Sequence, residues 1–283
     1  MPARIITTAR QERLGAELRK LREQAELTIR EAARLLGIDQ TKISHTEAGR
    51  VGVSEERVRL LTTQYACGDK ELVEALVAMA GEREHGWWEE FRGLLPAGFL
   101  DLAEMEHYAR YLRTIEISHI PGLMQTENQV RAIVSYSLPE LSEAELEARV
   151  AHRLRRRVIL DRASPPKFDA VVHEAALRIR VGDRKVARDQ LLHLAGESER
   201  PHVSIRVVPF DVDGFAGIGY PMLYVGGPVP QLDTVLLDSV HGSAFLHAES
   251  QVRRYRNLFS KVGKSALDER RSRDFMLRLA REM

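Results

Sequence analysis

The sequence of 283 residues contains one cysteine, Cys67, so no disulfide can form within the chain. A secreted domain stabilised by its own disulfides is therefore excluded, and a reducing compartment fits the composition. No apolar run approaches the length of about 20 residues that spans a bilayer. The N-terminal segment MPARIITTARQERLG also lacks the apolar core of a signal peptide. We expect a cytoplasmic protein, associated with the nucleoid if it binds DNA.

The chain also lacks a charge excess of either sign. It carries 42 Lys and Arg against 41 Asp and Glu, a formal net charge of +1. Residues 1–50 are only slightly basic, with 10 basic against 7 acidic side chains. Bulk charge therefore does not indicate a nucleic-acid partner, and such a function must depend on where individual cations lie. Only 7 of the basic residues are Lys, an Arg-rich usage typical of a high-GC genome.

Catalytic and metal-binding motifs are scarce. No Gly-x-Ser-x-Gly or His-Glu-x-x-His occurs. Asp211-x-Asp213-Gly214 resembles the start of a calcium loop, but the Glu that should follow is absent. Gly214–Gly219 has the wrong glycine spacing for a dinucleotide site, and one Cys with scattered His residues does not suggest zinc. We predict no cofactor, no metal and no enzymatic activity, with the pair His173-Glu174 as the place to test for an undetected one.

The first eighty residues predict five helices. Leu14, Leu18 and Leu21 recur at helical spacing, and Thr28-x-x-Glu31 is a capping box, in which each residue bonds the other's backbone N–H. Gly37 ends the second helix, Asp39 caps the third, and Ser54 caps the fourth. The expected ranges are 11–25, 28–36, 39–49, a helix after 54, and 70–80.

Two short helices joined by a turn with glycine form the pattern of a helix-turn-helix. Here Thr28-x-x-Glu-Ala-Ala-x-x-Leu-Gly-Ile is followed by Ile43-Ser and Glu47-x-Gly49. This arrangement resembles the DNA-binding domain of lambda-repressor-like regulators of the xenobiotic-response-element (XRE) type. A plain helical bundle with a polar surface is the alternative.

The resemblance implies an all-α, five-helix DNA-binding domain that binds a palindromic operator in double-stranded DNA as a homodimer. The N-terminal end of the third helix would enter the major groove, where Gln pairs with adenine and a Thr methyl contacts thymine. The candidate base contacts are Gln40, Thr41, Lys42, Ser44 and His45. The candidate phosphate contacts are Thr28, Arg30 and Arg50, and the family pattern also suggests a structural ion pair between Arg22 and Glu47.

Gly81–Gly86 is a polar stretch with two glycines, so we place a linker at 81–86 between a domain at 1–80 and a second at 87–283. The second domain predicts an α+β fold, a mixed sheet with packed helices. Expected helices are 99–117, 141–160, 174–180, 186–195, 249–262 and 267–281. Expected strands are 168–173, 203–208, 222–225 and 234–238, with 244–247 as a candidate fifth.

Several blocks in this half occur in a familiar order: Trp87-Trp88, Ile120-Pro-Gly-Leu-Met-Gln-Thr, an Arg-rich run at 153–157, His173-Glu-Ala-Ala-Leu-Arg, and Val203-x-Ile-x-Val. Together they resemble the C-terminal domain of antitoxin-like regulators of streptomycetes and related actinomycetes. Those regulators are often encoded beside a very small partner protein. One departure is Glu127–Ala132, where the family usually has an aromatic residue.

The resemblance implies a regulator whose second domain receives a signal, either a small protein or a small-molecule ligand. We expect the same domain to dimerise. The candidate surface for that effector or partner comprises Trp88, Pro121, Met124, Gln125, Phe215 and Tyr220. Two other interpretations stay open: a protein whose main role is to sequester a small toxin-like partner, and a DNA-reading domain fused to an enzyme. The basic run at 153–157 fits either the negative end of a helix or a phosphate site.

Overall fold

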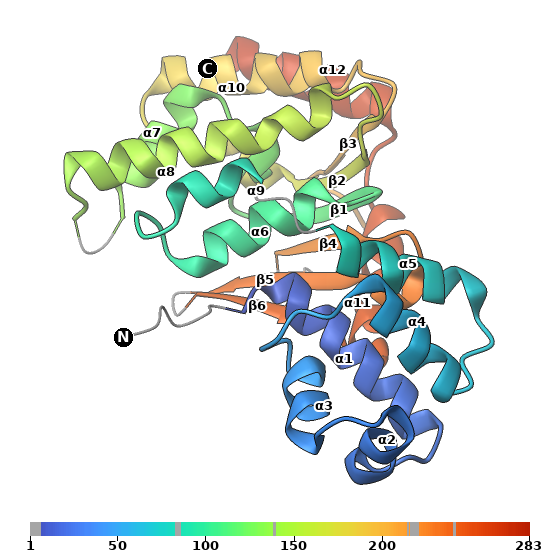
Figure 1. Cartoon of the computed structure of the whole chain (residues 1–283). Helices are drawn as coiled ribbons and strands as arrows, with labels where there is room; N and C mark the ends of the chain where they lie inside the picture. The colour runs from blue at the N-terminus through green and yellow to red at the C-terminus, as the bar shows by residue number, and fades with distance from the viewer. Residues whose placement is uncertain (1–6, 83–85, 138–139, 214, 216–220, 240–241) are drawn as a thin grey trace. The chain divides into compact units, whose positions relative to one another are not determined.

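The computed structural model describes residues 7–82, 86–137, 140–213, 215, 221–239 and 242–283 (Figure 1). The chain divides into two compact units. The helical unit comprises Met1–Glu89 with Pro228–Leu232, and the sheet unit comprises Glu90–Gly227 with Asp233–Met283. This division falls a few residues beyond the linker predicted at 81–86, of which residues 83–85 lie outside the described part of the chain.

Five α-helices form the N-terminal part of the helical unit, as the sequence predicts. Each begins after a polar residue whose side chain accepts from a backbone N–H of the first turn, which satisfies one of the otherwise unpaired donors there. The helices are α1 (Ala9–Gln24), α2 (Ile29–Leu36), α3 (Gln40–Glu47), α4 (Glu55–Gln64) and α5 (Lys70–Gly81).

Two glycines explain how α1, α2 and α3 come together. Gly37 ends α2 in the left-handed conformation, with φ of 61°, which costs glycine little and turns the chain into α3. Gly15 lies where α1 crosses α3. A Cβ at this position would stand 2.6 Å from the carbonyl oxygens of Thr46 and Glu47, so a larger residue would push the two helices apart.

A short segment from far along the chain completes the helical unit. Val229 and Leu232 are buried in the same apolar cluster as the helices. Arg13 donates to the Gln231 carbonyl, and the Gln231 side-chain amide donates to Asp69 over 2.9 Å. The core of this unit is therefore not made by the N-terminal sequence alone.

The sheet unit contains a six-stranded mixed sheet in the order β3-β2-β1-β4-β5-β6. The first three strands run parallel, with Thr114 of β1 opposite Ala170 of β2, and the other neighbours pair antiparallel. The strands are β1 (Tyr111–Glu116), β2 (Lys167–His173), β3 (Val203–Val208), β4 (Met222–Gly226), β5 (Thr234–Ser239) and β6 (Gly242–Leu246).

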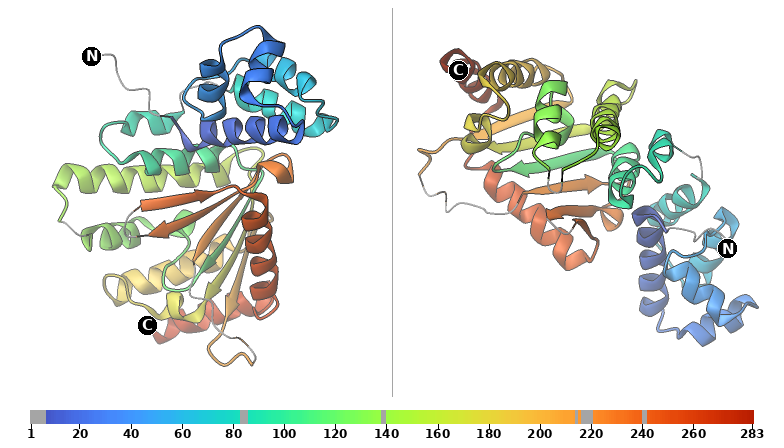
Figure 2. Two further views of the ribbon diagram at one scale, coloured as in Figure 1. Left: turned by 90° about the horizontal axis from the view of Figure 1, so that it is seen from below. Right: turned by 90° about the vertical axis from the view of Figure 1, so that its left-hand side faces the viewer.

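Helices cover both faces of this sheet, which confirms the predicted α+β fold (Figure 2). On one face α11 packs through Val252 and Phe259 against Ile115 and Val171. The opposite face carries α10 and α12 over Phe168, and most of the remaining helices. The helices are α6 (Ala97–His107), α7 (Glu127–Ser135), α8 (Glu143–Arg156), α9 (Glu174–Arg178), α10 (Arg184–Glu197), α11 (Glu249–Gly263) and α12 (Glu269–Glu282), with short 3₁₀ turns at Gly122–Met124 and Arg157–Asp161. Two further 3₁₀ turns are Trp87–Phe91, at the division between the units, and Pro230–Leu232, in the helical unit.

The predicted helix over 99–117 is wrong in its second half. Helix α6 ends at His107, and β1 (Tyr111–Glu116) is a central strand between β2 and β4. Leu112 and Ile115 are three residues apart, which fits a helix, but both are completely buried on opposite faces of the sheet. Pairing on both edges overrides the local pattern here. The predicted helix 141–160 likewise ends as an α-helix at Arg156 and continues as a 3₁₀ turn.

Candidate nucleic-acid interface and a pocket in the sheet unit

Most polar side chains of helix α3 face solvent, beginning in the first turn of the helix. Gln40, Thr41, Lys42 and Ser44 are exposed and His45 is partly buried, whereas Ile43 is buried in the core of the helical unit. Asp39 caps the helix by accepting from the Thr41 backbone N–H over 2.6 Å, and hydrogen bonds from Thr41 lower the pKa of Asp39. The predicted base-reading residues thus form one accessible surface at and after the N-terminus of α3.

A buried ion pair connects the inward side of α3 to α1. The Arg22 guanidinium donates to both carboxylate oxygens of Glu47, over 2.7 and 2.8 Å, and also to the Leu27 carbonyl. Only 5% of Arg22 and 9% of Glu47 are exposed. The hydrogen bonds with Glu47 raise the pKa of Arg22 although burial opposes the charge. The bidentate geometry fixes α1 and α3 relative to each other, so the outward face of α3 has a rigid support.

The exposed start of α3 borders an open hollow of about 850 Å³. Gln40 and Thr41 line it together with Thr28 and Arg30 from the start of α2. Arg34 lies one turn after Arg30 on the same helix and lines the hollow too. The structure therefore brings two predicted base contacts and two predicted phosphate contacts to one concave surface.

Four cations near this surface form no ion pair among the described residues: Arg30, Arg34, Lys42 and Arg50, although the charge of Arg34 helps to lower the pKa of Glu31. All four side chains are exposed. Elsewhere in the unit some exposed cations are paired, as Arg59 is with Glu74 over 2.5 Å, whereas Lys70 at the start of α5 is also exposed without an ion pair among the described residues. A cluster of unpaired cations is the arrangement that phosphate oxygens can neutralise.

Thr28 is already engaged within its own helix. Its hydroxyl donates to the Glu31 carboxylate over 2.6 Å and accepts from the Glu31 backbone N–H over 3.2 Å. The Glu31 carboxylate also accepts from the Thr28 N–H, and these bonds lower the pKa of Glu31. A contact from the Thr28 hydroxyl to phosphate would have to replace a capping bond.

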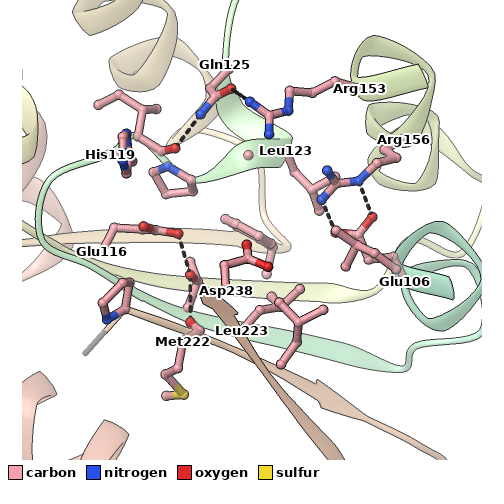
Figure 3. A pocket seen from close by; sticks show the side chains of 18 of the residues that line it. Glu106, Glu116, His119, Leu123, Gln125, Arg153, Arg156, Met222, Leu223 and Asp238 are labelled. Atoms are coloured by element: carbon pink, nitrogen blue, oxygen red, sulfur yellow. Dashed lines mark hydrogen bonds and ion pairs between the residues drawn. The ribbon is translucent and has the colours of Figure 1, made fainter. Parts of the chain in front are cut away.

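The sheet unit contains a pocket of about 290 Å³ (Figure 3). Its floor is formed by residues of β1, β4 and β5 on the sheet face opposite α11, and its walls come from α6, α8 and the turn after β1. The wall is largely apolar, through residues such as Leu102, Ile133 and Phe168. Charged groups also project into it, namely Glu106, Glu116, Arg153, Arg156 and Asp238.

Two arginines from α8 meet this pocket with different partners. Arg156 donates to both oxygens of Glu106 over 2.7 and 2.6 Å, and both residues are buried. Arg153 donates to the side-chain oxygen of Gln125 over 3.2 Å, and no carboxylate of the described residues pairs with it. Burial, and then the charge of Arg156, lower the pKa of Arg153 to about 10, so it remains a cation at neutral pH.

Glu116 is a carboxyl group that burial disfavours in its charged form. Burial raises its pKa from 4.5 to about 8, while Thr114 partly opposes the shift. The Thr114 hydroxyl lies 3.0 Å from both a Glu116 oxygen and the Met222 carbonyl oxygen. A hydroxyl has one proton, so it cannot serve both acceptors fully. A protonated Glu116 resolves this, since it can donate to Thr114 while Thr114 donates to Met222.

The residues proposed as an effector or partner surface are dispersed. Pro121 and Gln125 are buried and line the pocket. Met124 is completely buried in the main core and Trp88 is 3% exposed, so neither offers an accessible surface in this conformation. Phe215 stacks on His173, with ring centroids 5.8 Å apart. Tyr220 and most of the glycine-rich segment at 214–219 lie outside the described residues.

Sequence reasoning missed the charged residues of the pocket. Glu116 lies in the strand that was predicted as helix, so its inward direction could not be read. The sequence places Arg153 in a basic run that fits a helix end or, as the alternative, a phosphate site, but does not predict the pocket that this arginine lines. Two signals were present: Glu116 and Asp238 each stand near the end of an apolar strand, and Arg153 and Arg156 are spaced three apart, on one helix face.

Comparison with known protein families assigns both parts of the chain. A helix-turn-helix domain matches residues 13–76, and a domain of unknown function, DUF5753, matches residues 99–278. No curated protein and no solved structure matches. No helix in the described ranges is long and apolar enough to cross a membrane. The DUF5753 match covers more than half of the chain, which therefore belongs to the DUF5753 family and carries an N-terminal helix-turn-helix domain of the kind found in DNA-binding regulators.

Proposed function

We propose that this protein is a cytoplasmic, sequence-specific transcriptional regulator of the XRE type that binds a palindromic operator as a homodimer. The observation that carries the proposal is the outward face of α3. Four polar residues with base-reading chemistry, Gln40, Thr41, Lys42 and Ser44, are exposed there, and the buried pair Arg22–Glu47 holds the helix from behind. An Asn- or Gln-type amide and a hydroxyl are the groups that read base edges in the major groove.

The unpaired cations around α3 support the same role. Arg30, Arg34, Lys42 and Arg50 could contact phosphates on either side of the reading helix and fix its register. A single small domain makes few base contacts, so a dimer on two half-sites about one helical turn apart would provide the remaining affinity.

We further propose that the sheet unit carries the regulatory signal. In the antitoxin-like regulators that it resembles, this signal would come from a small protein encoded next to the regulator. An effector of this kind acts by binding more tightly to one arrangement of the two DNA-reading domains than to the other.

The test is a gel shift and footprint on DNA from upstream of the protein's own gene, with and without the product of an adjacent small gene. We expect a symmetric footprint on the DNA, and light scattering of the complex should give the mass of a protein dimer. The affinity for the DNA should change when the small protein is added. If the protein protected no defined DNA sequence, or bound every DNA with the same low affinity, the DNA-reading role would be contradicted.

A second candidate, regulation by a small molecule, is favoured by one observation. The pocket beside Arg153 is large enough for a small ligand, and its charged groups are only partly neutralised. In that case the same footprint would form, but the adjacent small protein would not change it.

We propose a binding role, not a catalytic one, for the sheet unit. The pair His173-Glu174, the strongest sequence candidate for catalysis, is engaged in structural contacts. His173 accepts from the Ala175 N–H over 3.2 Å, and Glu174 bonds Arg178 and the Phe210 N–H. Turnover of any substrate that is lost in His173→Ala, with folding intact, would overturn this proposal.

A further inference from the structure

The pocket of the sheet unit holds a cation, Arg153, that forms no ion pair with a described residue, although the more distant charges of Asp238 and Glu106 favour its charged form. Arg153 extends from α8 into the cavity and is only partly accessible there. Its neighbour Arg156 has a bidentate partner in Glu106, so that carboxylate is already used. The one hydrogen-bond partner recorded for Arg153 in the described structure is the neutral amide of Gln125. A partly buried guanidinium with this environment gains strongly from an incoming anion.

The Gln125 amide is not free to move away from Arg153. Its nitrogen donates to the Ile120 carbonyl over 2.7 Å, which directs its oxygen toward the guanidinium. Gln125 is only 3% exposed. The amide therefore holds Arg153 in place, with the remaining N–H groups of the guanidinium available to a ligand.

Acidic groups line another part of the same pocket. Glu116 projects from β1, and Asp238 from β5. Asp238 accepts from the Ser243 hydroxyl over 2.6 Å, and its charge is one of the causes that raise the pKa of Glu116. Because the charge of Asp238 disfavours ionisation of Glu116, a positive group placed beside the two carboxyl groups would favour the carboxylate form of Glu116.

The size and lining of the pocket limit what can bind. A volume of about 290 Å³ is at the lower end of the range for small-molecule sites, which are mostly apolar with a few convergent polar groups. The apolar wall includes Leu102, Ile133 and Leu236. The ligand must therefore be small, with an apolar part between two charged ends.

We propose that this pocket binds a zwitterion of amino-acid size, with its carboxylate on Arg153, its ammonium group on Glu116 and Asp238, and an apolar side chain against the cavity wall. This inference deepens the small-molecule form of the proposed function by naming the class of ligand. It concerns the sheet unit alone, so direct binding tests it without reference to DNA.

The first experiment is isothermal titration of the full chain with the L-amino acids that have apolar side chains. We expect saturable binding of at least one of them. Its two half-analogues, the same molecule without the amino group and without the carboxylate, should each bind at least tenfold more weakly. No heat from any of these amino acids at millimolar concentration, or equal binding of either half-analogue, would overturn the proposal.

Variants then assign the two ends of the ligand. Arg153→Met should reduce affinity at least tenfold for the zwitterion and for the deaminated acid, but leave the weak binding of the amine unchanged. Glu116→Gln should instead reduce the preference of the pocket for the zwitterion over the deaminated acid. Arg155→Gln is the matched control, because Arg155 lies on the same helix but pairs at the surface with Glu90. Arg153→Lys, which keeps the charge, should bind with intermediate affinity if Arg153→Met is poorly folded.

Proton release gives a readout that a purely structural role would not produce. Glu116 has a pKa of about 8 in the empty pocket, and an ammonium group beside it would lower that pKa and expel the proton near pH 7. The heat of binding should then depend on the ionisation enthalpy of the buffer, and this dependence should disappear in Glu116→Gln. The other charged or titratable groups that line the pocket are Glu106, His119, Arg153, Arg156 and Asp238. Release that persists in Glu116→Gln would assign the proton to one of these and contradict the placement of the ammonium group.

A failed gel shift and a failed titration have different meanings. If no operator is found but an amino acid binds with the predicted variant effects, the ligand inference stands and the regulatory role is wrong. If the operator footprint is clear but no amino acid binds, the regulator stands and the ligand inference is wrong.

Discussion

Each of the two units encloses one bidentate arginine–glutamate pair: Arg22 with Glu47 in the helical unit and Arg156 with Glu106 in the sheet unit. The pairs have similar geometry, with N–O distances of 2.6 to 2.8 Å, and all four residues are buried. Both connect a helix to another helix: α1 to α3 in the first case, and α6 to α8 in the second.

What differs is the surroundings of particular cations that form no ion pair with a described residue. In the helical unit Arg30, Lys42 and Arg50 face solvent around α3. In the sheet unit other such cations, for example Arg253 and Arg254, are also exposed, but Arg153 faces an internal pocket. The same side-chain chemistry therefore suits an extended polyanion in one unit and a single small anion in the other. Residue type alone does not distinguish these uses, because the distinction lies in the accessibility that packing creates.

The largest effect we expect is from breaking a buried pair. Glu47→Gln leaves the Arg22 guanidinium buried without a carboxylate, which typically destabilises a protein by about 3–5 kcal/mol. Chemical denaturation followed by circular dichroism should show a lower midpoint for the helical unit. The double variant Arg22→Met with Glu47→Leu should recover much of the loss, because it removes both buried charges together.

The matched control for that experiment is Glu74→Gln. Glu74 makes an equally short ion pair with Arg59, but the two side chains are 63% and 51% exposed. Exposed pairs contribute about 0–1 kcal/mol. Equal losses from Glu47→Gln and Glu74→Gln would show that burial does not set the strength of the Arg22–Glu47 pair.

The helical unit could be predicted well because its signals are local. Caps at Thr28, Asp39 and Ser54, and the left-handed Gly37, each depend on residues a few positions away. The exposure of Gln40 and Lys42 follows from the same periodicity. The contribution of Val229 and Leu232 to this core could not be predicted, because no local pattern links them to residues two hundred positions earlier.

The sequence predicts the α+β class of the sheet unit but not its central strand, β1. Both faces of strand β1 are covered by helices, so Leu112 and Ile115 are buried on opposite faces and its apolar residues do not keep the strict alternation that identifies a strand. Because β1 is not predicted, the inward direction of Glu116 and the pocket that it lines are not predicted either. The partner surface proposed at Met124 and Trp88 shows the same limit: a motif reveals that residues matter to a family, not whether they are exposed.

Glu116→Gln should change how stability depends on pH. The carboxyl has a pKa raised from 4.5 to about 8, so the folded state binds its proton more tightly than the unfolded state. Stability from this group is fully present below pH 4.5 and is lost as the pH rises toward 8. At about 1.4 kcal/mol per pKa unit the full effect would be roughly 5 kcal/mol, and we expect about 2–3 kcal/mol because water in the pocket screens the charge.

The measurement is a series of denaturation curves from pH 4.5 to 8.5 for the wild type and the variant. The difference in unfolding free energy should shift in favour of Glu116→Gln as the pH rises. If the difference in unfolding free energy between the two proteins stayed constant over this pH range, Glu116 would titrate with an ordinary pKa. The pocket would then differ less from the exposed charged surface of the helical unit.

Gln40→Ala should weaken binding to the specific operator by about 1–3 kcal/mol and relax the preference at one base position. The reason is that Gln40 is exposed at the start of α3, where its amide can bond a base edge. Competition binding with a set of operators mutated one position at a time measures this. Gln64→Ala, another exposed glutamine at the end of α4, should leave both affinity and preference unchanged. If Gln40→Ala weakened binding to all sequences equally, Gln40 would not be reading a base.

The smallest effect distinguishes a phosphate contact from general charge. Arg30→Ala should lower affinity for every DNA sequence alike and reduce the slope of log affinity against log salt by about 1. Arg19→Ala removes the same charge from the same unit, but Arg19 lies on α1 and pairs with Glu23 over 2.8 Å. Because counterion release depends on contacts with phosphate and not on net charge, the slope should change in Arg30→Ala and stay constant in Arg19→Ala. If the wild type, Arg30→Ala and Arg19→Ala all gave the same slope, Arg30 would be an exposed cation that contacts no phosphate. It would then not belong to the DNA-binding surface that distinguishes the helical unit from the sheet unit.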